Sequence, residues 1–311
     1  MSLLLLISPL CKGAYFADVQ KISQIELSTL YPDIGIEYVE LGTLAFWKVE
    51  LSQEEIPHLL RLSFVQGIFE FKEGLLLPIE AKAPFELPEE LVWGSKYRGK
   101  THEIVSQLAL NIALSYSSHE NPKILDPMAG RGTTILWAAR YGLSATGIEI
   151  DPTHMAAFYK HCKTQTKMQR IKHKMSTGFL GKKNRNGMGE FCTIQWGGIT
   201  SKLITGDSSD MDPKVFSEKF HLLITDLPYG IQFHGSANRR NPIDLIAHNL
   251  QKWPQYLHKN GIGVLIFNSL QPRRTELITL IEAQNLEVVD FQADHRMSES
   301  ILRDIVVFRK R

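Results

Sequence analysis

The chain has 311 residues, of which 43% are hydrophobic, enough to bury one large core or two smaller ones. The formal net charge is only +2, but residues 1–91 hold fourteen acidic and six basic side chains, a balance of −8 that leaves +10 for the remainder. If the chain has a polyanionic partner, this asymmetry predicts that the second part of the chain meets it. No run of roughly twenty apolar residues occurs, which excludes a membrane-spanning helix.

The three cysteines, Cys11, Cys162 and Cys192, are scattered and form no CxxC pair. This spacing predicts neither a disulfide framework nor a zinc site and fits a reducing, cytoplasmic setting. The opening run MSLLLLISPLCKGA has some features of a signal segment, but it lacks a basic start, and Leu10 occupies the place of a small residue before the cysteine. We expect it to form a buried first strand instead.

The first 80 residues predict six short elements. Their order is strand, helix, strand, strand, helix, strand, which is the order of a ferredoxin-like unit. We therefore expect a small α+β ferredoxin-like domain over residues 1–80, followed by a proline-rich linker over 81–95. The expected elements cover residues 3–9, 17–31, 35–40, 44–51, 54–62 and 65–71.

The second part, residues 96–311, begins with a helix over about 101–116 and then alternates strands with helices. Such alternation predicts a doubly wound α/β sheet of Rossmann-like type with helices on both faces. The connection before the last strand is too short for a helical crossover, so that strand should run antiparallel. The seven expected strands cover residues 123–127, 144–150, 202–207, 221–228, 261–268, 286–293 and 304–311.

A glycine-rich turn, DPMAGRGTT, follows the first of these strands at residues 126–134. Gly130 and Gly132 would let bare backbone amides approach a ligand, and the next helix N-terminus favours polar or anionic groups. The turn matches neither GxGxxG nor GxxxxGK[ST], which disfavours dinucleotide and nucleoside triphosphate sites. Many parallel sheets use such glycines only to fit a tight turn.

An acidic residue stands at the end of the next strand, in GIEID. The two oxygens of the Glu149 carboxylate could accept both hydroxyls of an adenosyl ribose. Asp151 is the second choice for this role. Alternatively, these acids cap the helix that starts at Pro152.

The third and fourth strands end in ITGDSS and TDLPYG. Asp207 could accept from an adenine amino group, or it could belong to a plain turn. The second stretch places Asp226, Pro228 and Tyr229 at a strand end. Because ligands of open α/β sheets bind outside the carboxyl ends of the strands, the four features should converge on one site.

Residues 96–311 resemble the class I S-adenosylmethionine-dependent methyltransferases, in particular those whose (Asp/Asn)-Pro-Pro-Tyr motif methylates exocyclic amines. YRGKT at 97–101 together with DLPYGI at 226–231 resembles the tRNA guanine-N2 methyltransferases within that class. This sequence departs from their pattern because Leu227 replaces the first proline. It also lacks room for the THUMP RNA-binding domain that those enzymes usually carry.

The resemblance implies S-adenosyl-L-methionine as cofactor and a seven-stranded methyltransferase sheet. Asp126, Gly130 and Gly132 would contact the methionine part, Glu149 the ribose and Asp207 the adenine, with Thr101 closing over the methionine end. The implied cofactor-binding set is Thr101, Asp126, Pro127, Ala129, Gly130, Gly132, Thr133, Glu149, Ile150, Asp207, Ser208 and Asp226. The implied catalytic set is Asp226, Leu227, Pro228 and Tyr229.

These residue types suit methylation of an exocyclic amine, whose lone pair is delocalised into the ring. Asp226 and the Leu227 carbonyl could accept the two N–H bonds and free the lone pair, while Pro228 presets the turn. Tyr229 offers a face for stacking a base, an interaction of about 1–3 kcal/mol. An ordinary Asp-x-Pro turn with a packed tyrosine is the structural alternative.

A basic segment follows the second strand: residues 160–185 contain nine Lys or Arg, and no acid occurs over 152–189. Residues 176–200 look like a mobile insertion, since they exceed the usual connection. The basic side chains could contact RNA phosphates or be plain solvated surface. The candidates for RNA contact are Lys182, Lys183, Arg185, Arg239 and Arg240. The histidines show no metal-ligand spacing, so no metal is expected.

The sequence therefore predicts a cytoplasmic RNA methyltransferase that acts on an exocyclic amine, with guanine N2 of tRNA as the leading acceptor. Adenine N6 or cytosine N4 in DNA, guanine N2 in ribosomal RNA and a protein glutamine are alternative acceptors. A non-catalytic subunit that positions RNA is the alternative from another class. The acidic N-terminal domain is expected to contact a protein partner or to brace the catalytic domain.

Overall fold

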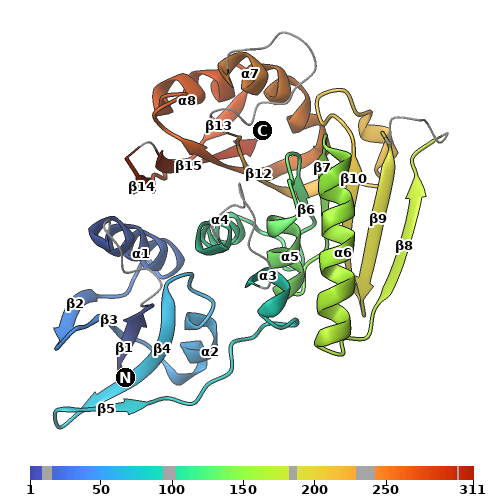
Figure 1. Ribbon diagram of the computed structural model, residues 1–311. Coiled ribbons are helices and arrows are strands. Elements are labelled where there is room, and N and C mark those ends of the chain that lie inside the picture. The colour runs from blue at the N-terminus through green and yellow to red at the C-terminus, as the bar shows by residue number, and fades with distance from the viewer. Residues whose placement is uncertain (9–15, 94–102, 182–187, 229–241, 300) are drawn as a thin grey trace. The chain divides into compact units, whose positions relative to one another are not determined.

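The computed structural model describes residues 1–8, 16–93, 103–181, 188–228, 242–299 and 301–311 (Figure 1). It divides into two compact units. The first comprises Met1–Phe85 and Ala293–Leu302, and the second comprises Glu86–Gln292 and Arg303–Arg311. The sequence-based boundaries at 80 and 96 did not anticipate that a segment near the C-terminus belongs to the first unit.

The first unit contains a five-stranded antiparallel sheet in the order β2-β3-β1-β4-β5. All six elements expected over residues 1–80 are present in the expected order, and β5 is an additional edge strand just before the segment expected to be a linker. The elements are β1 (Ser2–Ile7), α1 (Phe16–Leu30), β2 (Ile36–Leu41), β3 (Leu44–Glu50), η2 (Gln53–Glu55), α2 (Ile56–Leu59), β4 (Val65–Lys72) and β5 (Leu75–Pro78).

Two buried polar contacts fix helix α1 within this unit. The Trp47 indole Nε1–H on β3 donates to the Ser23 hydroxyl on α1 at 2.8 Å. The fully buried Glu26 carboxylate accepts from the Ser63 backbone N–H at 3.1 Å and from the Ser63 hydroxyl at 2.6 Å. Because a buried carboxylate is stable only when hydrogen-bonded, these contacts set the position of the helix.

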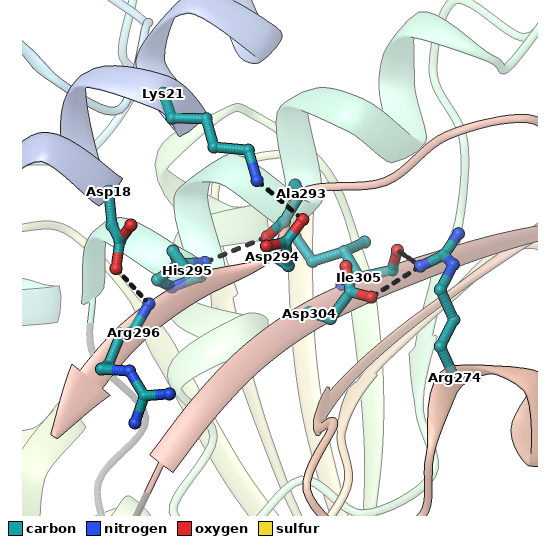
Figure 2. Close-up of polar contacts among 9 residues, drawn as sticks. All are labelled: Asp18, Lys21, Arg274, Ala293, Asp294, His295, Arg296, Asp304 and Ile305. Atoms are coloured by element: carbon teal, nitrogen blue, oxygen red, sulfur yellow. Dashed lines mark hydrogen bonds and ion pairs between the residues drawn. The ribbon is translucent and has the colours of Figure 1, made fainter. Parts of the chain in front are cut away.

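The C-terminal segment of the first unit, Ala293–Leu302, contains β14 (His295–Ser298), which pairs with β15 (Ile301–Lys310). Helix α1 holds it at two points. The Lys21 ammonium forms an ion pair with Asp294 at 2.8 Å, and the Asp18 carboxylate accepts from the Arg296 backbone N–H at 2.9 Å (Figure 2). Residue 302 thus ends the first unit, and Arg303 resumes the second.

The second unit is built on a ten-stranded mixed sheet in the order β13-β15-β12-β11-β6-β7-β10-β9-β8, with β14 paired to β15 outside this path. The neighbours from β10 through β12 are parallel, and β15 runs antiparallel to β12, as the sequence predicted. The strands are β6 (Ile124–Asp126), β7 (Ala145–Glu149), β8 (Lys174–Phe179), β9 (Glu190–Trp196), β10 (Ile199–Thr205), β11 (Phe220–Asp226), β12 (Leu257–Asn268), β13 (Leu286–Val288) and β15.

The expected count of seven strands was too low, although all seven expected strands are present. The additional β8 and β9 form an antiparallel extension beside β10 and come from the region expected to be a mobile insertion. Their ladder runs from Lys174 opposite Gln195 to Phe179 opposite Glu190. Cys192, Ile194 and Trp196 on β9 are buried, so alternate apolar side chains anchor this extension to the sheet.

Helices cover the sheet in two groups. Helix α5 contacts α3 and α4, α3 also contacts α6, and α7 contacts α8 and η5 (Figure 1). Consecutive residues of β11, such as Leu222, Leu223 and Ile224, are all buried, so both sheet faces are covered. The helices are α3 (Glu90–Trp93), α4 (Glu103–Ser115), α5 (Thr133–Arg140), α6 (Pro152–Met168), η3 (Pro213–Val215), α7 (Pro242–Lys252), η5 (Trp253–Tyr256) and α8 (Arg274–Glu282). Among the described residues, no helix combines the length and apolarity needed to cross a membrane.

Candidate active site

Four of the strand ends singled out in the sequence lie side by side in the sheet. Strands β10, β7, β6 and β11 are consecutive parallel neighbours, so their carboxyl ends share one edge. The glycine loop follows β6, Glu149 ends β7, and Asp226 ends β11, while Asp207 comes two residues after β10. The structure therefore brings together the described members of the predicted site.

The glycine loop needs its glycines for both conformation and space. Gly130 and Gly132 have φ angles of +53° and +82°, in the left-handed region that other residues disfavour. A Cβ on Gly132 would lie 2.6 Å from the Phe158 ring of α6, whereas a Cβ on Gly130 would meet nothing within 4 Å. Gly132 thus packs the loop against α6, and open space borders Gly130. Pro127, Ala129 and Thr133 are buried within the same turn.

Glu149 binds this loop directly. Its Oε2 accepts from the Gly130 backbone N–H at 2.8 Å, and its Oε1 accepts from the Asp151 backbone N–H at 2.8 Å. The Ala129 N–H donates to the Ile148 carbonyl at 2.9 Å, which adds a second contact between loop and strand. The carboxylate therefore shapes the loop, and Ile150 beside it is half-buried.

Asp151 is the N-cap of α6, as one sequence interpretation expected. Its side chain accepts from the Thr153 N–H at 2.8 Å, and Pro152 occupies the first helical turn. His154, in the first turn of the same helix, places its Nδ1 3.4 Å from Glu149 Oε1. The neighbouring Glu149 carboxylate raises the pKa of His154.

Asp126 is a buried carboxyl beneath the loop. Its Oδ1 accepts from the Thr225 hydroxyl at 2.7 Å and from the Met128 N–H at 3.1 Å. Burial nevertheless dominates and raises the pKa of Asp126 to about 7, with a smaller contribution from the nearby charge of Asp226. The carboxyl thus supports the turn from below and links β6 to β11.

The raised pKa of Asp126 predicts a pH-dependent stability. The folded chain keeps the proton up to about pH 7, whereas the unfolded chain loses it near pH 4, so the free energy of unfolding should fall as the pH rises between these values. Asp126→Asn cannot ionise and should lack this fall, which we expect to be on the order of 2–4 kcal/mol. Urea unfolding of both proteins at about pH 5 and about pH 8 measures it. Equal falls in the two proteins would contradict the prediction.

The turn after β10 is held by aromatic residues that the sequence analysis did not assign to the site. Asp207 Oδ1 accepts from the Ser209 N–H at 2.9 Å, so the acid does take part in a turn. The Ser208 hydroxyl accepts from the Trp253 indole at 3.0 Å, and the Tyr256 hydroxyl lies 2.7 Å from the Ser208 carbonyl, to which it can donate. Both aromatic residues are fully buried in η5. They fix the backbone beside Asp207.

The described part of the fourth strand end comprises Asp226, Leu227 and Pro228. The Leu227 side chain is buried in the core with α7 and α8, and its N–H donates to the Ile266 carbonyl at 2.8 Å. A proline at this position could not donate that hydrogen bond. The leucine therefore gains a tie to β12 in place of the stiffness of proline, and Pro228 next to it is half-buried.

The sequence analysis missed Arg303, which reaches Asp226 from β15. Arg303 Nη1 pairs with Asp226 Oδ1, and the two side chains are only 7% and 15% exposed. The two residues are 77 positions apart in the sequence. The one signal in the sequence was a charged residue directly before the expected last strand at 304–311, and it does not identify the partner.

Seven predicted residues lie outside the described parts of the chain. Among the described residues, no group of three or more His, Cys, Asp or Glu side chains could hold a metal ion. Cys162 and Cys192 are buried free thiols. The seven undescribed residues are Thr101, Lys182, Lys183, Arg185, Tyr229, Arg239 and Arg240.

Comparison with known proteins gives distant structural matches. No protein-family model and no curated protein matches the sequence. The crystal structure of TrmN from Thermus thermophilus matches with a TM-score of 0.47 and 12% identity, over 89% of this chain and 60% of that one, so this chain spans 60% of the TrmN structure. A methyltransferase from Pyrococcus furiosus matches with a TM-score of 0.45 and 14% identity, over 71% of this chain and 92% of that one. An rRNA methylase from Streptococcus thermophilus matches with a TM-score of 0.39 and 10% identity, over 62% and 88%.

Proposed function

We propose that this chain is an S-adenosylmethionine-dependent methyltransferase that modifies an exocyclic amine of RNA, with guanine N2 in tRNA as the acceptor. The observation that supports the proposal best is the alignment of four strand ends at one sheet edge, each with a group suited to one part of the reaction. A fold of this kind hosts many activities, so the chemistry of these groups must distinguish one activity from another.

The donor set fits the proposed cofactor. Open space beside Gly130 leaves room for a ligand against the loop backbone. Glu149 already uses both oxygens for backbone N–H groups, yet each carboxylate oxygen has further lone pairs with which to accept ribose hydroxyls. Asp207 would accept from the adenine amine at a turn that Trp253 and Tyr256 hold rigid. The cofactor, when bound, supplies an electrophilic methyl group.

The acceptor half of the site is TDLPYG. Asp226 and the Leu227 carbonyl would accept the two N–H bonds of the amine and leave its lone pair directed at the methyl group. The Leu227 N–H bond to Ile266 holds the backbone that presents this carbonyl. Tyr229 would supply the stacking face for the base. No strong base is needed, because the amine proton becomes acidic once the nitrogen is methylated.

An RNA substrate is supported by charge and by motif. The +10 balance lies after residue 91, in the part of the chain that holds the site. We assign phosphate contacts to Lys182, Lys183, Arg185, Arg239 and Arg240. The preference for tRNA guanine N2 depends on the resemblance of YRGKT and DLPYGI to that family. The alternatives are adenine N6 or cytosine N4 in DNA, guanine N2 in rRNA, a protein glutamine and a non-catalytic RNA-positioning subunit.

The first unit is best explained as a ferredoxin-like domain, because its β-α-β-β-α-β order and its sheet order fit that fold. Its acidic character disfavours contact with phosphate. We infer that it binds a protein partner or supports the catalytic domain. A cytoplasmic location fits a reducing setting for the two described thiols, which are free.

Calorimetry with S-adenosylhomocysteine tests the cofactor assignment. We expect binding with measurable heat and a raised melting temperature, because a ligand that binds only the folded state stabilises it. NAD⁺ and ATP serve as matched controls and should give neither signal, since the loop has neither of their motifs. Absence of any response to S-adenosylhomocysteine would refute the enzymatic proposal.

Mass spectrometry of nucleosides identifies the acceptor. Bulk tRNA and rRNA from a strain that lacks this protein should have lost N2-methylguanosine from the tRNA fraction. Loss of a different methylated nucleoside would replace guanine N2 by that acceptor and leave the cofactor assignment intact.

A further inference from the structure

A buried ion pair joins the predicted catalytic carboxylate to the last strand of the sheet. Arg303 Nη1 contacts Asp226 Oδ1, and the exposed fractions of the side chains are 7% and 15%. The pair spans two strands that are not neighbours, since β12 lies between β11 and β15. Asp226 pairs with Ile266 and Arg303 with Asn268 along opposite sides of β12. The arginine thus reaches across the end of the central strand.

The backbone that carries Arg303 is itself fixed. The adjacent Asp304 is fully buried, and its Oδ2 accepts from Arg274 Nη1 at 2.8 Å, while Arg274 also donates to the Ile305 carbonyl at 3.0 Å (Figure 2). Asp304 Oδ1 accepts from the Ile305 N–H at 2.7 Å. These contacts lock β15 one residue after Arg303. An anchored backbone restricts the places that the guanidinium can reach.

Stability alone does not explain the pair. Removing two charges from water costs several kcal/mol for each ion, and apolar replacements of buried ion pairs are often neutral or stabilising. The geometric effect is more specific: a guanidinium on an anchored backbone that binds Oδ1 restricts the positions that the Asp226 carboxylate can take. A carboxylate offers about four lone-pair sites, so arginine on Oδ1 does not exhaust its capacity to accept.

We propose that Arg303 is the positioning residue of Asp226, holding the carboxylate oriented so that it accepts an N–H of the substrate amine. The inference rests on the proposed function, because it assigns the role of a second residue in the same reaction. Arg303 does not touch the substrate and acts through Asp226. A misplacement of about 1 Å can cost about a hundredfold in rate, so a fixed carboxylate has a large effect on transfer.

The test combines three variants of the full chain with two readouts. Arg303→Met removes the positive charge, and Arg303→Lys retains the charge without the planar guanidinium group. Arg303→Ala leaves room for guanidinium added to the solution. Arg140→Met is the matched control, because Arg140 is a buried arginine of the same unit that donates to the Leu87 carbonyl. The readouts are S-adenosylhomocysteine affinity and the rate of tritiated methyl transfer to total RNA from a strain lacking the protein.

We expect Arg303→Met to lower kcat by about a hundredfold with cofactor affinity unchanged, and Arg303→Lys to retain an intermediate rate. Guanidinium should restore part of the rate of Arg303→Ala and have no effect on Arg140→Met. A wild-type kcat in Arg303→Met would overturn the role proposed for Arg303. So would a loss of rate in folded Arg303→Ala that guanidinium does not relieve. Either result leaves the proposed function of the chain intact. If the wild-type chain neither binds S-adenosylhomocysteine nor transfers methyl, the proposed function fails and the role of Arg303 falls with it.

Discussion

Replacing Asp226 by alanine should lower the rate of methyl transfer by at least about a hundredfold, because the amine loses the group that orients its lone pair. Affinity for S-adenosylhomocysteine should stay close to that of the wild type. The glycine loop and Glu149 are held by β6 and β7 and by their mutual hydrogen bonds, none of which involves Asp226. The two effects are therefore separable, and calorimetry combined with a transfer assay measures both.

Two further variants complete this experiment. Alanine at 226 leaves Arg303 buried without its carboxylate, which can lower stability by itself. Asp226→Asn preserves the shape and one acceptor oxygen, so it should transfer at an intermediate rate. Asp212→Ala is the matched control, since Asp212 is an exposed acid of the same unit that caps η3. Undiminished transfer by folded Asp226→Ala would mean that the amine is held elsewhere.

The sequence allowed much of the second unit to be predicted because its information is local. Short apolar runs in β11, β12 and β15 mark strands buried on both faces, and a glycine or an acid marks the ends of β6, β7, β10 and β11. The rule that parallel strands end at one edge then places Asp207 near Glu149 without any contact information. The Gly206 N–H donates to the Glu149 carbonyl at 2.8 Å, which joins these two strand ends.

The features that escaped prediction depend on long-range contacts. Arg303 and Asp226 are 77 residues apart, and Lys21 and Asp294 are 273 apart. Strand β8 is rich in polar, exposed residues, and the short apolar alternation of Cys192, Ile194 and Trp196 in β9 was not recognised as a strand from the sequence. No local pattern could show that residues 293–302 return to the first unit. Pairings of this kind are set by tertiary packing, which overrides local propensity.

Leu227 shows how the structure changes the interpretation of a single departure from a motif. Compared with the proline of the family pattern, leucine leaves the backbone torsion φ unrestricted and makes the turn less rigid. Its N–H donates to Ile266, and its side chain packs in the core, so the chain gains two contacts that proline could not provide in the same way. The backbone at the acceptor turn is therefore held by hydrogen bonding and packing.

Gly147→Ala should impair cofactor binding from a position that touches no proposed ligand atom. A Cβ at Gly147 on β7 would lie 2.5 Å from both the Ala129 Cβ and the Ile135 Cδ1, and 2.9 Å from the Leu203 Cδ1. Ala129 belongs to the glycine loop and Ile135 to α5, so both must move away from the strand. Overpacking of this kind costs typically about 1–3 kcal/mol. We expect S-adenosylhomocysteine affinity to fall by at least about tenfold.

Two comparisons distinguish displacement of the loop from general destabilisation. Gly198→Ala is the matched control, because a Cβ there meets nothing within 4 Å; its stability should stay within about 0.5 kcal/mol and its affinity should not change. Adding Ala129→Gly to Gly147→Ala removes one of the two closest contacts and should restore part of both losses, which reveals the coupling as non-additivity. Purely additive effects, or full affinity in Gly147→Ala, would show that the packing of the loop on β7 does not govern the cofactor site.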